Sequence, residues 1–391
     1  MNAVAELLAD LVAIPSMNPM GRSRNGMSNA SPLFGGEYSE QNLADYLASC
    51  LRRHHIDVEI QACATRLEGE SHIMRPNVLG RIDVNAPRTL LLDAHMDTVQ
   101  AENMPTPFTP VVKEGKLYGR GACDTKGSIA AFLSAVTETL RNNQFTWNVL
   151  LLFTSDEEYG FTGAREAMQR RLKADAGITG EPTQLRIIRA HKGVVRWHIR
   201  TRGVAAHAAY PERGENAIYT MASVVSRLQR YAEELLHLTP HPVLGTPTLS
   251  VGVIEGGEAV NVVPASCRIE IDRRSLPGET TESILQPVHA LLRDLPAVDD
   301  EPPYLVAAGM EVAEHAEVVR RLSEAIHSVT GDVNIEPASY ATNAGTFNAA
   351  GIPTVVFGPG NIAQAHTNAE FIELNEVEQA AAIIKHLLTT H

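Results

Sequence analysis

Cysteine is scarce in this chain, and its few copies are scattered. The 391 residues include four cysteines, at positions 50, 63, 123 and 267, and no Cys-x-x-Cys pair. Such pairs are the usual ligand units of thiolate zinc sites, and regularly spaced cysteines mark disulfide-stabilised domains. Neither kind of protein is therefore expected, and a reducing, cytoplasmic location is predicted.

Long apolar runs and an excess of basic residues are also missing. No stretch approaches the roughly 18 consecutive apolar residues that a membrane-spanning helix needs. The N-terminal segment carries acidic residues in place of the basic start of a signal peptide. The formal net charge of −13 disfavours nucleic acids and anionic membranes as partners. We expect a globular enzyme that acts on a small molecule, with no nucleic-acid or membrane partner.

Short apolar strands alternate with helices in the first half of the chain. The expected strands are 57–62, 77–82, 88–93, 147–154 and 176–179, and the helices between the last three are 126–141 and 162–171. Alternation of this kind predicts the α/β class, with a doubly wound, mostly parallel sheet.

The pattern changes after about residue 187. A strand, a helix, two strands and a helix follow within about 110 residues, which predicts a small inserted α+β domain. The pair Gly256-Gly257 predicts a tight hairpin between strands 248–255 and 259–273. A chain of this length is too long for one ordinary core. We therefore expect a catalytic domain formed by 1–187 and 297–391, and an inserted domain formed by 188–296.

Histidines and carboxylates follow the expected strands. These residues are His95 after 88–93, Glu157 and Glu158 after 147–154, Glu181 after 176–179, and His366 after a strand at 353–357. Ligands of open α/β sheets bind at the carboxyl ends of strands, so these side chains should converge. Any one of them is more often a helix cap or a solvated loop residue. Their repeated occurrence at one topological position favours a hydrolytic metal site, since carboxylates mixed with imidazoles suit zinc, cobalt or manganese.

The segment Gly119-Arg-Gly121-Ala-Cys-Asp124 begins like a dinucleotide-binding fingerprint. The third glycine of that fingerprint is replaced by Asp124, and no long buried strand is expected before it. Dinucleotide binding is therefore not expected. The two glycines instead allow a tight turn that directs Asp124 inward.

The order of these motifs resembles that of the metal-dependent amidohydrolases that include acetylornithine deacetylase, succinyl-diaminopimelate desuccinylase and carboxypeptidase G. The resemblance covers almost the whole chain. The motifs that carry it are His95-Met-Asp97-Thr, 119–127, 155–160, 180–183, 203–208, 261–264, 272–278 and His366. It implies that the inserted domain is a ferredoxin-like lid and dimerisation domain.

The resemblance also implies a centre with two divalent metal ions, zinc first, with cobalt or manganese as alternatives. The implied ligands are His95 and Glu181 for one ion, Glu158 and His366 for the other, and Asp124 as the bridge between them. Asp97 would orient His95 through its second ring nitrogen. Glu157 would be the general base that activates a metal-bridging hydroxide.

The inserted domain is implied to contribute to binding and catalysis. His207 would reach the active site of a partner subunit and stabilise the oxyanion, which implies a homodimer formed through this domain. Arg274 and Asn261 would bind the substrate carboxylate, a task that suits the planar guanidinium. Ala344 stands where many relatives carry an acidic residue, so a relative's specificity does not transfer. The 16–37 loop is longer than usual and could contact substrate or partner.

The expected reaction is hydrolysis of an amide bond next to a free carboxylate. Deacylation of an N-acyl amino acid, as in acetylornithine deacetylase, is the first hypothesis. A dipeptidase or carboxypeptidase acting on a short peptide is the alternative, because it needs Arg274 and the same metals. A non-catalytic binding protein on this fold is a third hypothesis, which the presence of Glu157 and all the ligands disfavours.

Overall fold

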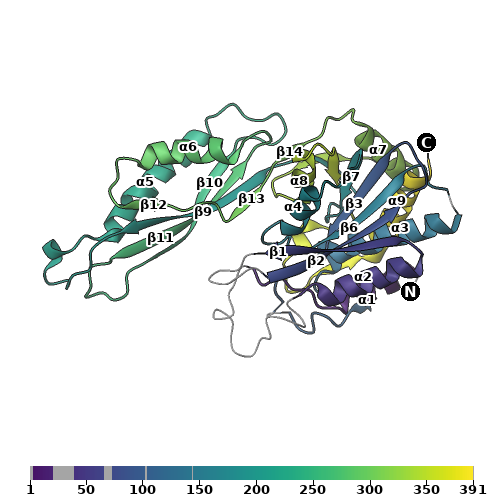
Figure 1. The fold of residues 1–391 in the computed structure, drawn as a ribbon, viewed down its shortest axis with the longest axis horizontal. Helices are drawn as coiled ribbons and strands as arrows, with labels where there is room; N and C mark the ends of the chain where they lie inside the picture. The colour runs from purple at the N-terminus through teal and green to yellow at the C-terminus, as the bar shows by residue number, and fades with distance from the viewer. Residues whose placement is uncertain (1–2, 21–38, 66–72, 102–103, 143, 391) are drawn as a thin grey trace. The chain divides into compact units, whose positions relative to one another are not determined.

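The computed structural model describes residues 3–20, 39–65, 73–101, 104–142 and 144–390. Most of the 16–37 loop therefore lies outside the described residues. The chain divides into two compact units (Figure 1). The first unit comprises Met1–Arg189, Val312–Glu336 and Thr342–His391, and the second comprises Ala190–Glu311 and Pro337–Ala341.

The first unit is built on a mixed sheet. Its strands are, in spatial order, β1 (Asp57–Thr65), β2 (Ile73–Ile82), β6 (Asn148–Thr154), β3 (Thr89–His95), β7 (Ala176–Thr179), β16 (Thr354–Val356) and β8 (Ile187–His191), with β15 (Ile335–Ala338) also paired to β8. The last strand in this order, β14 (Met310–Glu311), pairs with Ala190 and His191 at the end of β8, and these residues belong to the second unit. The four central strands β6, β3, β7 and β16 are parallel to their neighbours within this group. The predicted mostly parallel sheet is confirmed.

Helices cover both faces of this sheet. They are α1 (Ala3–Val12), α2 (Gln41–Arg53), α3 (Gly127–Asn142), α4 (Thr162–Gln169), α7 (Glu317–Thr330), α8 (Asn343–Ala349) and α9 (Leu374–Thr389). On one face, Leu91 and Leu152 pack in a cluster with Ala164 of α4 and Phe347 of α8. Side chains alternate along a strand, so the equally buried Leu92 points to the opposite face, where α3 contacts β3. The doubly wound architecture follows from this covering of both faces.

A small second sheet in the first unit was not predicted. Its strands are, in order, β17 (Phe371–Glu373), β5 (Lys116–Tyr118) and β4 (Val111–Lys113). Strands of three residues carry too little periodicity to be recognised in the sequence. The pairing of β5 with β17 brings the segment before Asp124 beside the segment after His366.

The second unit is an antiparallel sheet with two helices on one face. Its strands are, in order, β10 (Thr248–Gly256), β11 (Ser266–Ser275), β9 (Gly193–Arg202) and β12 (Val298–Asp300), with β13 (Leu305–Ala307) also paired to β9, and its helices are α5 (Ala217–Leu235) and α6 (Thr281–Leu292). Trp197, Ile271, Met221 and Val288 belong to the core between sheet and helices. The sequence of elements β9-α5-β10-β11-α6-β12 is the βαββαβ arrangement of ferredoxin-like domains, as predicted.

Two expectations about this unit require correction. The hairpin at Gly256-Gly257 is not tight, because β11 begins only at Ser266. The intervening residues pair elsewhere: Val263 N donates to Ala206 O (2.8 Å), and Ala208 N donates to Asn261 O (3.0 Å). The second unit also extends past the expected boundary at residue 296, because β12 and β13 add to β9.

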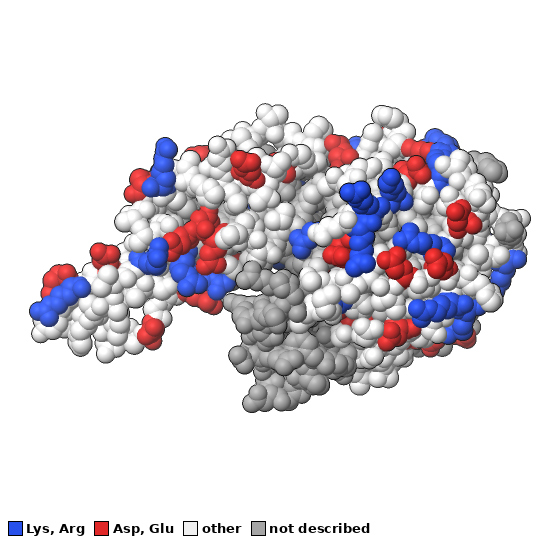
Figure 2. Space-filling view, in the orientation of Figure 1, with Lys and Arg blue, Asp and Glu red and all other residues white. Residues whose placement is uncertain are grey.

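Charges of both signs are mixed on one face of the molecule. On the face drawn in Figure 2, lysine and arginine side chains lie among aspartate and glutamate side chains. Exposed ion pairs include Arg81–Glu59 (3.1 Å) and Arg170–Glu166 (2.9 Å). Among the described residues, no helix has both the length and the apolar character that a bilayer crossing demands.

Candidate metal centre

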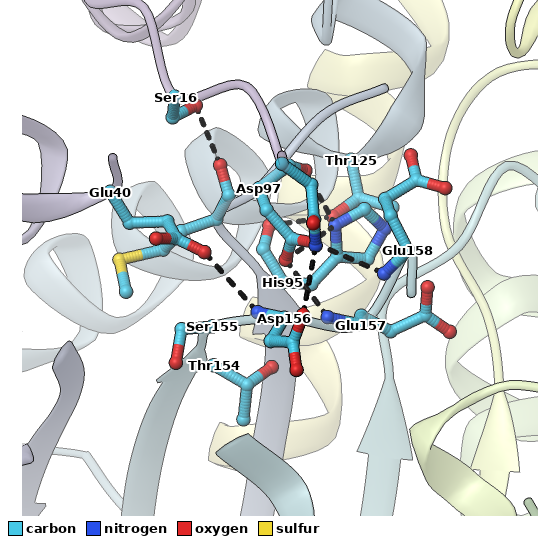
Figure 3. Close-up of polar contacts among 12 residues, drawn as sticks. Ser16, Glu40, His95, Asp97, Thr125, Thr154, Ser155, Asp156, Glu157 and Glu158 are labelled. Atoms are coloured by element: carbon cyan, nitrogen blue, oxygen red, sulfur yellow. Dashed lines mark hydrogen bonds and ion pairs between the residues drawn. The ribbon is translucent and has the colours of Figure 1, made fainter. Parts of the chain in front are cut away.

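The carboxyl ends of three neighbouring parallel strands meet at one edge of the central sheet. β3 ends at His95, β6 runs into the turn 155–158, and β7 runs into Glu181. Main-chain hydrogen bonds hold the ends together, since Met96 N donates to Thr154 O (2.7 Å) and Gly180 N to Asp93 O (2.7 Å). The convergence that parallel strands impose is visible in Figure 3 for the residues from β3 and β6.

Asp124 lies between two histidines. Its Oδ1 is 3.0 Å from His95 Nε2, and its Oδ2 is 3.3 Å from His366 Nε2. Beyond the histidines lie two further carboxylates: Glu181 Oε1 is 3.8 Å from His95 Nε2, and Glu158 Oε2 is 3.1 Å from His366 Nε2. The predicted bridging residue thus touches one histidine with each of its oxygens.

Several side-chain atoms of this cluster are placed to bind cations. Within the part of the chain that the structure describes, two groups could each hold an ion: His95, Asp124 and Glu158, and His95, Glu157 and Glu181. Glu158 Oε1 and Glu181 Oε1 are buried without a hydrogen-bond partner. A buried carboxylate oxygen without a partner is costly, so these atoms fit a metal ligand set better than a structural role.

The cluster concentrates negative charge away from water. Burial, with the charges of neighbouring carboxylates, raises the pKa of Glu157 and of Glu181 well above the ordinary value. Hydrogen bonds to Asp124 and Glu158 raise the pKa of His366 to about 10. Burial alone would lower the pKa of His95, but its bond to Asp124 and the nearby carboxylates raise it. Divalent cations would neutralise these carboxylates and displace the protons from both imidazoles.

Asp97 supports the site in a different way from the one predicted. His95 Nδ1 is 2.8 Å from the main-chain carbonyl of Asp97, whereas the Asp97 carboxylate is 3.7 Å away. That carboxylate instead accepts the main-chain N–H groups of Glu157 (3.0 Å) and Glu158 (3.1 Å). Asp97 therefore fixes the backbone of both glutamates, whose carboxylates point in different directions in Figure 3.

A buried ionic network lies behind the same turn. Asp156, with a φ of 61°, donates its main-chain N–H to Glu40 Oε1 (3.2 Å), and its carboxylate pairs with Arg75 (2.8 Å). Arg75 Nε also donates to Glu40 Oε2 (2.8 Å). The side-chain amide of Asn18 donates to both Asp97 (2.8 Å) and Asp156 (3.0 Å). Three consecutive N–H groups, those of residues 156–158, are thus each bound by a buried carboxylate from a distant part of the chain.

The turn that carries Asp124 uses its glycines as predicted. Gly121 has a φ of 80°, which favours glycine, and a Cβ there would lie 2.7 Å from Thr98 Cγ2. Sequence reasoning missed the acceptor for this turn, the buried carboxylate of Glu370, which binds Asp124 N (3.1 Å). The turn is therefore fixed both by local conformation and by a residue far along the chain.

Another buried carboxylate, Asp93, lies two residues before His95. Asp93 Oδ1 accepts from Thr154 Oγ1 (3.1 Å), which in turn accepts from Asn343 Nδ2 (2.9 Å). Burial raises the pKa of Asp93 to about 7. Its signal was present in the sequence, as one acid inside an apolar strand. Ala344 is fully buried beside Asn343, and its N–H donates to Thr342 Oγ1 (3.2 Å).

The predicted site residues of the second unit are not clustered in this way. His207 is exposed, and its Nδ1 accepts from Ala209 N (3.0 Å). Asn261 is also exposed. Arg274 is half-buried and forms two bonds to Asp272, from Nε (2.7 Å) and from Nη2 (3.3 Å). Each of these side chains therefore lies within the second unit without contributing to an enclosed site there.

Comparison with known sequences decides the family. A sequence model described as peptidase family M20/M25/M40 matches residues 91–390. The chain belongs to this family. Acetylornithine deacetylase from Proteus mirabilis is 32% identical to this M20 family member over 394 residues, covering 98% of this chain and 95% of the relative. The corresponding enzyme from Myxococcus xanthus is 36% identical over 282 residues, covering 70% of this chain and 72% of the relative.

Solved structures of peptidases share the fold. A metallo-carboxypeptidase from Sulfolobus solfataricus has a TM-score of 0.79 at 20% identity, covering 100% of this chain and 99% of the other. A tripeptidase from Staphylococcus aureus has a TM-score of 0.75 at 20% identity, covering 99% and 97%. With the family and the relatives above, the chain is a metal-dependent hydrolase of amide bonds, as predicted.

Proposed function

We propose that this M20 family enzyme removes the acyl group from an N-acyl amino acid, with N-acetylornithine as the first substrate to test. The observation that carries the proposal is the pair of imidazoles on opposite oxygens of Asp124, in a chain that matches acetylornithine deacetylase over 98% of its length. A dipeptidase or carboxypeptidase is the alternative, because the same centre would serve a short peptide.

The ligand assignment follows the distances around Asp124. His95 and Glu181 would hold one divalent ion, Glu158 and His366 would hold the other, and Asp124 would be shared between them. Zinc is proposed as the native metal, with cobalt or manganese as substitutes, since imidazole and carboxylate ligands suit all three. Bound ions would polarise the scissile carbonyl and lower the pKa of a water molecule.

Glu157 is proposed as the general base. Its main-chain N–H is bound by Asp97, as is that of its neighbour Glu158. Asp97 thus fixes the backbone of both glutamates while their side chains diverge. Glu158 can therefore bind a metal ion while Glu157 faces the attacking water. Burial raises the pKa of Glu157 well above its ordinary value, which suits a group that first accepts a proton and then returns it to the leaving amine.

The second unit is proposed to act as an inserted lid and dimerisation domain. Arg274 and Asn261 would bind the substrate carboxylate. Because Arg274 now forms two bonds to Asp272, the substrate would share or replace that partner. His207 is proposed to stabilise the oxyanion in the active site of a partner subunit.

A homodimer formed through this unit has support in its surface. β10 is an edge strand of the sheet, with unpaired main-chain groups available to another strand. Apolar side chains lie exposed on it, with Val253 at 44% and Ile254 at 58% exposure, and Tyr219 of the contacting helix α5 is 73% exposed. In a two-fold symmetric dimer, the interface would bury these side chains of both subunits.

The action of His207 in trans can be tested by complementation. The His207→Ala and Glu157→Gln variants, each inactive alone, are mixed in equal amounts and allowed to exchange subunits. If His207 serves the partner, each mixed dimer regains one intact site, and the activity returns to about a quarter of the wild-type value. If His207 serves its own chain, the mixture stays inactive.

The substrate class is tested by a panel of N-acetylornithine, other N-acyl amino acids and dipeptides, assayed with zinc and with cobalt. Preference for dipeptides would replace deacylation by the peptidase alternative. Absence of hydrolysis of every member would contradict both assignments. A cytoplasmic location is also proposed, supported by four cysteines that are all buried and free.

A further inference from the structure

Glu370 is a fully buried carboxylate that does not belong to the proposed metal ligands. Its Oε2 accepts from Arg120 Nη1 (2.7 Å) and Gly121 N (3.0 Å), and its Oε1 accepts from Cys123 N (2.9 Å) and Asp124 N (3.1 Å). All four donors belong to one segment of five residues, although that segment lies 246 to 250 positions away in the sequence. One carboxylate therefore organises the whole turn.

The last of these donors is the amide of Asp124 itself. Fixing that N–H fixes the backbone from which the bridging carboxylate extends. The following residue is held as well, since Thr125 Oγ1 donates to the main-chain carbonyl of His95 (3.0 Å). The turn is therefore held to Glu370 on one side and to the end of β3 on the other.

Glu370 also fixes the segment that carries His366. It lies four residues after His366, and its own carbonyl accepts from Gly119 N (3.2 Å). Immediately afterwards, Phe371 pairs with Tyr118 in the β5–β17 ladder. The His366 side chain is 55% exposed, and its described polar contacts are those to Asp124 and Glu158. The approach of His366 to Asp124 therefore depends on the junction at Glu370.

We propose that Glu370 is a positioning residue that joins the Asp124 turn to the His366 segment and so maintains the metal site formed by Asp124, His366 and Glu158. The inference rests on the proposed metal assignment. Loss of the Glu370 carboxylate should weaken that site more than the site formed by His95 and Glu181. The site with His366 loses the support of two ligands, Asp124 and His366, whereas the site with His95 loses only that of Asp124.

The test is Glu370→Gln, measured by zinc binding in competition with a chromophoric chelator. The amide keeps the size of the side chain but replaces one acceptor oxygen by a donor, which must face an N–H group or Arg120. We expect the dissociation constant of one zinc equivalent to rise at least about tenfold, as for other supports of metal ligands, and that of the other equivalent to change by less than about threefold. The absorption of bound cobalt should change in the same variant.

Glu279→Gln is the matched control. Glu279 also accepts from a buried arginine, Arg273 (2.8 Å), and from a main-chain amide, Leu276 N (2.6 Å), but it lies in the second unit and supports no proposed ligand. Its substitution should leave both zinc constants unchanged. If Glu370→Gln does not fold, the Arg120→Met/Glu370→Leu double variant removes both charges and the acceptor together, and the same selective loss of zinc is expected.

Wild-type affinity for both equivalents in the Glu370 variant would overturn the proposal. So would an equal loss of both equivalents, which would show a general role in folding. If the wild-type chain itself binds fewer than two equivalents of zinc, the proposed two-metal centre is wrong. The role proposed for Glu370 is then wrong as well.

Discussion

The two units hold their proposed site residues in opposite ways. In the first unit, His95, Asp124 and Glu157 are buried, and each has its backbone or ring fixed by hydrogen bonds to other buried groups. In the second unit, His207 and Asn261 are exposed and lie outside the hydrophobic core. The first unit thus contains an assembled centre, whereas the second displays side chains at its surface.

This difference shows where precision is needed. Metal ligands must be held to within fractions of an ångström, so they require rigid strand ends and bound turns. A side chain that meets a substrate or a partner can be fixed when that molecule arrives. The predictions below test this contrast, beginning with the largest expected effect.

Glu157→Gln should separate catalysis from metal binding in the first unit. We expect kcat to fall by about a hundredfold to ten thousandfold, because proton transfer is lost, with the bound metal content unchanged. His95→Ala should instead empty one site. Metal analysis together with steady-state kinetics measures both effects. Loss of metal from the Glu157 variant would make Glu157 a ligand, as its place beside His95 and Glu181 also allows.

Arg75→Met should show how much the support behind the turn contributes to stability. Arg75 is buried between Glu40 and Asp156, so its removal leaves two buried carboxylates without their cation. The unfolding free energy should fall by about 3–5 kcal/mol. Arg81→Met, on the same strand but in an exposed pair with Glu59, should cost less than about 1 kcal/mol. Urea unfolding measures both free energies. Equal losses in the two variants would show that the buried network stabilises the fold no more than the exposed pair does.

His191 provides a buried titrating group in the second unit. Burial lowers its pKa from 6.5 to about 4. The unfolded chain therefore takes up a proton below about pH 6.5, while the folded chain stays neutral. Stability should be complete above pH 6.5 and decline as the pH falls towards 4, by at most about 3 kcal/mol. His191→Gln should reduce this pH dependence. If the unfolding free energy of the variant changes between pH 7 and 5 with the same slope as that of the wild type, the assignment to His191 is wrong.

Ile254→Lys should disturb only the association of the second unit. A charge on the edge strand β10 should raise the dimer dissociation constant at least about tenfold, without changing the metal content. Light scattering over a range of concentrations measures the mass. Met74→Lys is the control, because Met74 is similarly exposed, at 63%, on a strand of the first unit. A mass that stays dimeric in the Ile254 variant, or falls in both variants, would contradict an interface through β10.

The first unit was largely predictable because buried strands have a strong sequence signal. Apolar runs ending in His95, Glu157 and Glu181 place these residues at one sheet edge as soon as the sheet is parallel. The supports could not be predicted in the same way. Glu370 stands in a polar segment after His366, where an acid is normally solvated. Arg75 lies before the strand start expected at residue 77, although β2 begins at Ile73.

The second unit shows a different limit of sequence reasoning. Its order of elements predicted a small α+β domain correctly, and the family resemblance implied the ferredoxin-like arrangement that the structure shows. The extent of the hairpin was wrong because residues 261–263 pair with 206–208, a contact between segments that are distant in sequence. The short strands β12 and β13 were missed because three residues carry no detectable period.

The junction at Glu370 has a consequence for how the protein is made. Synthesis runs from the N-terminus, so the strands that end at His95 and Glu181 can pair while the segment 366–373 has not yet been translated. Until that segment is added, the N–H groups of the Asp124 turn lack their carboxylate acceptor, and Asp124 lacks its second histidine. The proposed site for the second ion can therefore be completed only after the segment 366–373 has been translated, whereas the ends of β3 and β7 can already be paired by then.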